Sequence, residues 1–129
     1  MKGYKIGIGE DAKTVFLVSI ELDIPEEYPG LRIMSDDRQF RSNVARVLKI
    51  KAFNRSDSLK SAVSLFDHDF VYRPGEIVVP NHYDQIPVIC AGGIHFFLNP
   101  VRAYLYSTTS WPLAQLLDYS AKTGKGLRV

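Results

Sequence analysis

The sequence predicts a single α+β domain, in which a mostly antiparallel sheet is followed by two C-terminal helices. Alternating apolar residues over 4–22 are typical of a β-hairpin, and shorter strand-like runs continue to residue 98. Helix start signals then follow at Asn99 and Ser110. The length of 129 residues fits one domain, 1–129, since domains cluster near ~100–150 residues.

The opening hairpin is predicted from two alternating segments. Tyr4, Ile6 and Ile8 alternate with polar or small residues, which favours a half-buried strand. Residues 9–13 read as a turn, and 14–22 again place apolar side chains at every second position. The turn-rich segment 23–37 then separates this hairpin from the next strand.

Further strands are predicted at 44–53, 76–79 and 93–98, while the short apolar runs 62–66 and 70–72 could be strand or irregular. The run 62–66 fits a strand, but its apolar spacing also fits a helix, so its type stays open. In 93–98, Ile94 and Phe96 share one face. His95 is therefore expected on the opposite face, away from the main core.

The two helices are predicted from their ends. Asn99 is a suitable N-cap and Pro100 a suitable first helical residue. A second helix begins at Ser110, and Gly124 ends it, leaving a basic tail at 125–129. Apolar residues fall at helical spacing in both helices: Val101, Tyr104, Leu105, Leu113, Leu116 and Leu117.

Composition excludes several classes of protein. A net charge of +2, from 16 basic and 14 acidic residues, argues against a broad nucleic-acid interface. The single cysteine, Cys90, excludes an internal disulfide and suits a reducing cytoplasm. No apolar run approaches the ~20 residues of a membrane span, and no targeting segment is visible. We therefore expect a cytoplasmic protein that does not bind membranes.

The candidate ligand-binding residues fall into three chemical types. Arginines could bind phosphate or carboxylate, the glycine pair could direct backbone N–H groups at an anion, and aromatic rings could stack on a flat ligand. His95 could contact a ligand or act as a base. For each, an ordinary surface or core role stays open. The candidates are Arg41, Arg46, Tyr72, Tyr83, Gly92, Gly93, His95 and Phe97.

No cofactor, metal site or catalytic set is predicted. His68 and His82, with Asp69 and Asp84, match no established spacing of metal ligands. Cys90 would be a nucleophile only if a base approached it, so a structural role is favoured. The segment 122–126 lacks the first glycine of a phosphate-binding loop.

Four segments, 40–48, 62–67, 70–75 and 90–97, together resemble a small domain of unknown function found in large DNA viruses and phages. Some relatives carry that domain beside pentapeptide repeats. The segment 90–97, which reads CAGGIHFF, is the most specific of the four. The resemblance implies a viral or phage origin and action inside the infected cell.

We therefore expect a non-enzymatic protein that binds a small nucleotide-like ligand and sequesters a host immune signal. One alternative is an enzyme of ADP-ribosyltransferase-like type acting on nucleotides or NAD. Another is a protein-interaction module, which the fusion of related domains to repeat proteins favours. Homo-oligomerisation is compatible with ligand sequestration, but the sequence does not decide it.

Overall fold

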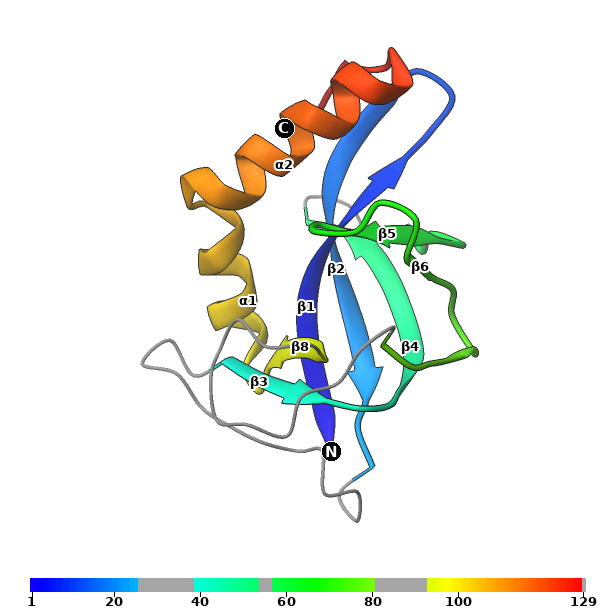
Figure 1. Ribbon diagram of the computed structural model, residues 1–129, viewed down its shortest axis with the longest axis vertical. Helices are drawn as coiled ribbons and strands as arrows, with labels where there is room; N and C mark the ends of the chain where they lie inside the picture. Colours follow the sequence, from blue (N-terminus) through cyan, green and yellow to red (C-terminus); the bar gives the residue numbers. More distant parts are fainter. Residues whose placement is uncertain (26–38, 54–56, 81–92, 129) are drawn as a thin grey trace.

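The structure is a computed structural model and describes residues 1–25, 39–53, 57–80 and 93–128. It confirms the predicted α+β architecture. A curled, mainly antiparallel sheet forms half a barrel and is followed by two helices along one side (Figure 1). The main path of the sheet runs β3-β8-β1-β2-β4-β7, so β1 and β2 lie at its centre.

Within the described residues there are nine strands and two helices. Strands β5 and β6 pair with each other beside β1, and β9 pairs with β2. The elements are β1 Lys2–Glu10, β2 Thr14–Asp23, β3 Gln39–Ser42, β4 Ala45–Ala52, β5 Ala62–Ser64, β6 Val71–Tyr72, β7 Ile77–Val78, β8 Ile94–Phe97, α1 Pro100–Ser107, α2 Ser110–Thr123 and β9 Gly126–Leu127.

The predicted hairpin is present, and its turn is closed by Asp11. Strands β1 and β2 pair from Lys2 opposite Asp23 to Glu10 opposite Val15. The backbone N–H of Asp11 donates to the carbonyl of Thr14 over 3.0 Å. Its carboxylate in turn accepts the Thr14 backbone N–H over 2.7 Å, an Asx-type turn that satisfies the donors at the tip.

The sheet has a hydrophobic core on each face. The inner cluster fills the curl, and the helix-facing cluster lies between the sheet and the helices. Even-numbered residues of β2 point inward, while Val15 points toward the helices, as strand alternation requires. The fully buried members include Val18, Ile20, Leu22 and Phe96 inside the curl and Ile8 and Val15 on the helix side.

On β1 the inner face carries glycines and one lysine. Its inward positions are Gly3, Lys5, Gly7 and Gly9, because Ile6 and Ile8 belong to the helix-facing cluster. A Cβ at Gly7 would lie 2.7 Å from Ile20 Cδ1 and 2.9 Å from the Val63 carbonyl oxygen. The curl of the sheet therefore requires glycine at this position.

Both helices begin as predicted, and the second also ends as predicted. The Asn99 side chain accepts the Val101 N–H over 2.7 Å, and Pro100 is the first helical residue. Helix α2 ends at Gly124, whose φ of 73° is a left-handed conformation that glycine readily adopts.

The side that each helix turns to the sheet differs from what the apolar spacing suggests. Small residues, Ala103 and Ser107, are the buried residues of α1. The buried residues of α2 are Pro112 and Leu116. Small side chains let the helix backbone approach the sheet closely. The larger apolar residues at 101, 104, 105, 113 and 117 are consequently exposed.

Two strands were not predicted from the sequence. Strand β3 lies just before the predicted strand 44–53 and pairs with β8, with Arg41 opposite His95. Strand β9 forms within the basic tail and pairs in parallel with the start of β2. The predicted strand 93–98 is confirmed as β8, but it has a core on both faces, since Phe97 lies in the helix-facing cluster.

Candidate functional site

The predicted site residues lie in several different places. Arg41 and His95 are direct cross-strand partners on β3 and β8, so their side chains share the face that also carries Phe97. Only 1% of Arg41 is exposed, and His95 is half-buried. Phe97 packs on Tyr106 of α1, with ring centroids 5.4 Å apart, beneath the helices.

The other predicted residues are separate from this pair. Arg46 is exposed on β4, and its Nη1 donates to the Gly75 carbonyl oxygen over 3.2 Å. Gly93 precedes β8 with a φ of 146°, a conformation that favours glycine. Tyr83 and Gly92 lie outside the described residues, as does Cys90.

Tyr72 lies inside the curl, where it contacts the inward-facing Lys5. The Lys5 ammonium donates to the Tyr72 hydroxyl over 2.6 Å and lies 4.8 Å from the Tyr72 ring centroid. Burial lowers the pKa of Lys5 from 10.5 to about 7. Burial, together with the charge of Asp67, raises the pKa of Tyr72. The pair is thus a polar contact within the inner core.

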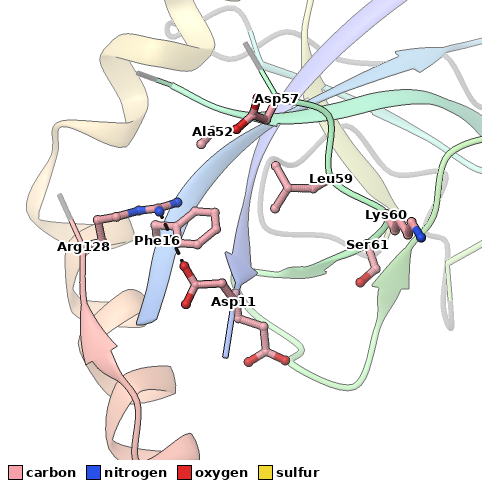
Figure 2. Close-up of a pocket in the computed structure, with 9 residues that line it drawn as sticks. Asp11, Phe16, Ala52, Asp57, Leu59, Lys60, Ser61 and Arg128 are labelled. Atoms are coloured by element: carbon pink, nitrogen blue, oxygen red, sulfur yellow. Dashed lines mark hydrogen bonds and ion pairs between the residues drawn. The ribbon is translucent and has the colours of Figure 1, made fainter. Parts of the chain in front are cut away.

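A pocket of about 330 Å³ opens at the hairpin end of the half-barrel (Figure 2). Phe16 and Ala52, both members of the inner cluster, supply part of its wall. This volume is at the small end of the ~300–1,000 Å³ typical of ligand sites, which often occupy barrel mouths. The hairpin, β4, the segment after β4 and the C-terminal tail contribute Glu10, Asp11, Phe16, Ala52, Asp57, Leu59, Lys60, Ser61 and Arg128.

Arg128 lies against an aromatic ring in this hairpin pocket. Its guanidinium carbon is 3.8 Å from the Phe16 ring centroid, a cation–π contact. Its Nη1 also lies 3.5 Å from Asp11 Oδ2. Figure 2 shows Phe16 and Arg128 on one side of the pocket, with Leu59 and Lys60 on the other. A flat guanidinium and an apolar wall thus face the same space.

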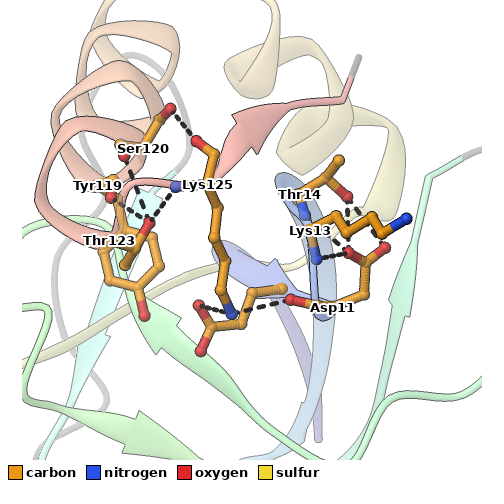
Figure 3. A network of polar contacts seen from close by, with 8 residues as sticks. Asp11, Lys13, Thr14, Tyr119, Ser120, Thr123 and Lys125 are labelled. Atoms are coloured by element: carbon orange, nitrogen blue, oxygen red, sulfur yellow. Dashed lines mark hydrogen bonds and ion pairs between the residues drawn. The ribbon is translucent and has the colours of Figure 1, made fainter.

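The tail is fastened to the hairpin by Lys125 (Figure 3). The Lys125 ammonium lies 3.2 Å from Glu10 Oε2 and donates to the Asp11 carbonyl oxygen over 2.8 Å. Ser120 of α2 donates to the Lys125 carbonyl oxygen over 2.6 Å, which joins the tail to the helix. Burial, with the Glu10 carboxylate close by, raises the pKa of Tyr119.

The charges around the hairpin pocket nearly balance. Glu10 is paired with Lys125, and Asp11 with Arg128. Hydrogen bonds from Lys13 and Thr14 hold the pKa of Asp11 at about 2, so its carboxylate is ionised at neutral pH. Lys60 is exposed and forms no ion pair with the residues that the structure describes. The arrangement suits a small ligand with a flat ring and one anionic group.

None of the six predicted ligand-binding residues that the structure describes lines this pocket. Its members come from three parts of the chain that are distant in sequence, 10–16, 52–61 and residue 128, and no local pattern marks any of them. The one signal in the sequence is the basic tail at 125–129, which contains Arg128. Among the described residues, no group of three or more histidine, cysteine or acidic side chains could hold a metal.

Residues 2–103 match the model of one protein family. The chain belongs to DUF5758, a family of unknown function. The match spans the whole curled sheet as far as the start of α1, except for β9. No curated protein and no solved structure matches the chain.

The DUF5758 match leaves most of α1, all of α2 and the tail outside it. Arg128 of the hairpin pocket and Lys125, which holds the tail on the hairpin, therefore lie outside the matched residues. Neither helix of the described chain is long and apolar enough to cross a membrane.

Proposed function

We propose that this DUF5758 protein is a non-enzymatic viral or phage protein that sequesters a small nucleotide-like ligand, a host immune signal, in the cytosol. The hairpin pocket carries the proposal, because it combines a guanidinium stacked on an aromatic ring with a nearby exposed lysine. The viral setting rests on the resemblance of the segment 90–97 to domains of large DNA viruses and phages.

The chemistry of the lining supports a nucleotide-like ligand. A nucleobase would stack on the Arg128–Phe16 pair, which offers a flat cationic and aromatic surface. A phosphate would pair with the Lys60 ammonium, and the Ser61 hydroxyl and Asp57 carboxylate would bond ribose hydroxyls. The volume of about 330 Å³ favours a mononucleotide unit over a larger one.

The lining also supports binding without catalysis. The pocket holds no histidine or cysteine among its described lining residues. Asp11, with its pKa of about 2, is a poor general base at neutral pH. The Glu10 carboxylate is 3.2 Å from the Lys125 ammonium, a contact that holds the tail on the hairpin.

Titration calorimetry against mononucleotides, cyclic nucleotides and ADP-ribose derivatives tests the proposal. We expect one class to bind, and chromatography after long incubation to recover that ligand unchanged. Arg128→Met and Lys60→Met should each weaken its affinity by ~10-fold or more, as expected for lost charge-assisted bonds. Arg73→Met is the matched control, because Arg73 is exposed and paired only locally with Glu76.

Two outcomes would count against this function. If no compound in the panel binds, the pocket does not take a nucleotide-like ligand. If a compound binds but is recovered chemically altered, the protein is an enzyme, as in the ADP-ribosyltransferase-like alternative.

A further inference from the structure

The cations that the tail brings to the hairpin pocket are already paired. The Lys125 ammonium lies 3.2 Å from Glu10 Oε2, and Arg128 Nη1 lies 3.5 Å from Asp11 Oδ2. The Arg128 guanidinium is also stacked on the Phe16 ring, with 3.8 Å between the guanidinium carbon and the ring centroid. Both cations of the tail therefore have a carboxylate beside them.

Lys60 is the cation of the pocket that differs from these two. It lies on the opposite side of the pocket from Arg128, in the segment that follows β4 (Figure 2). Lys60 is exposed and forms no ion pair with the described part of the chain. Among the described lining residues, Lys60 is thus the one cation that has no carboxylate partner.

The carboxylate of Asp11 is fixed in place at the hairpin turn. It accepts the backbone N–H groups of Lys13 and Thr14 over 2.8 and 2.7 Å, and these bonds hold its pKa at about 2. Asp11 is therefore ionised at neutral pH and cannot turn away without losing both bonds. A negative charge placed near Asp11 and Glu10 is repelled, because like charges brought together disfavour binding.

The number of negative charges on a ligand therefore decides how well the pocket can hold it. One negative charge pairs with Lys60. A second charge remains unpaired unless it draws Arg128 or Lys125 away from its carboxylate. A phosphodiester carries one negative charge, whereas a phosphate monoester carries ~1.5–2 at pH 7, because its second pKa is about 6.

We propose that the hairpin pocket selects a phosphodiester nucleotide, such as a cyclic mononucleotide, over nucleotides that end in a phosphate monoester or a polyphosphate. This selectivity rests on the proposed function, since it takes the ligand to be nucleotide-like and names its class. It comes from rejection of a second negative charge rather than from an additional contact with the phosphate. The volume of about 330 Å³, which favours one nucleotide unit, is compatible with a cyclic mononucleotide.

Glu10 is the residue on which the selectivity depends most directly. Its carboxylate neutralises Lys125, whose ammonium also donates to the Asp11 carbonyl oxygen over 2.8 Å. In Glu10→Gln, Lys125 should keep this hydrogen bond but lose its carboxylate partner, and it then becomes a second cation for a doubly charged phosphate. Glu76→Gln is the matched control, because Glu76 also pairs with an exposed cation, Arg73, but does not line the pocket.

Titration calorimetry with the 5′-monophosphates of adenosine, guanosine, cytidine and uridine, each beside its 5′-methyl phosphate ester, tests the proposal. At pH 8 the two members of a pair differ by one methyl group and one negative charge. We expect the methyl ester to bind ~10-fold tighter at pH 8, and the two affinities to converge at pH 5, where the monophosphate also carries a single charge. The methyl ester keeps one charge throughout, so the ratio of affinities corrects for titration of the protein.

Glu10→Gln should reduce the preference at pH 8 to less than ~3-fold by tightening the binding of the monophosphate, whereas Glu76→Gln should retain it. Circular dichroism and thermal unfolding establish that both variants fold, and the pH comparison on the wild-type protein tests the proposal without them.

Three results would overturn the selectivity and leave the proposed function in place: equal affinities at pH 8, tighter binding of the monophosphates, or a preference for the ester that persists at pH 5. If neither member of any pair binds, the selectivity also fails. The proposed function fails with it only if the wider panel of nucleotides gives no binding either.

Discussion

Lys5 provides a quantitative test of how the inner core is built. Its pKa is about 7 in the folded protein, against about 10.4 for an ordinary lysine. At a pH between these two pKa values, Lys5 is protonated in the unfolded state but has released its proton in the folded state. The free energy of unfolding therefore rises with pH above 7, and the rise ends near the unfolded pKa.

The size of the effect follows from the pKa difference. One pKa unit corresponds to ~1.4 kcal/mol, so this group alone should raise the free energy of unfolding by roughly 3 kcal/mol between pH 7 and pH 9.5. The double variant Lys5→Met with Tyr72→Phe removes the amine and its hydroxyl partner together and leaves neither unpaired. It should lose this rise and be more stable at pH 7 by roughly 1–4 kcal/mol.

Urea unfolding followed by circular dichroism, at pH 7, 8, 9 and 9.5, measures both quantities as differences from the wild type. The contributions of other titrating groups to the free energy of unfolding cancel in this difference. Lys51→Met, at an exposed position of β4, is the control and should keep the rise. Because the pKa of Tyr72 is raised, its ionisation lowers stability only above about pH 10, outside the range measured. A double variant with the same pH dependence as the wild type would refute the reasoning.

Two further predictions concern the hairpin and the curl. Asp11→Ala should lower the melting temperature at pH 7. The folded-state pKa of Asp11, about 2, lies below the ordinary ~3.9. The difference in melting temperature from wild type should therefore shrink as the pH falls from 5 toward 2. Differential scanning calorimetry at several pH values measures this, and a difference independent of pH would contradict the role of the carboxylate. Gly7→Ala should destabilise by ~1–3 kcal/mol in urea unfolding, because its Cβ would lie 2.7 Å from Ile20 Cδ1. Gly126→Ala is its control, since the nearest atom there is 3.8 Å away, and equal effects of the two would show that the close approach does not matter.

The sequence was sufficient to predict the hairpin and the helix ends, because these elements depend on residues that are close together in the chain. The hairpin follows from alternation, and its turn from the residues between Gly9 and Thr14. The helix ends follow from Asn99 and Gly124, whose backbone conformations suit a cap. Strands β3 and β9 were missed because they are short and depend on pairing with β8 and β2, which are distant in sequence.

The candidate site was less predictable than the fold. Arg41 and His95 do meet across two strands, but that pairing needed β3, which the sequence pattern did not show. The hairpin pocket joins Phe16, Lys60 and Arg128, and no pattern within any one segment indicates that they converge. Apolar spacing predicted that both segments are helical, but it did not predict which side of each helix faces the sheet.

The tail that carries β9 ties the end of the chain to its first hairpin. Lys125 and Arg128 pair with Glu10 and Asp11 at the hairpin, and Ser120 joins the same tail to α2. The C-terminal end of α2 and the tip of the hairpin are therefore linked by polar contacts at the surface, in addition to the apolar core between helices and sheet. A change that breaks the Lys125 contacts should consequently loosen both ends of this link together.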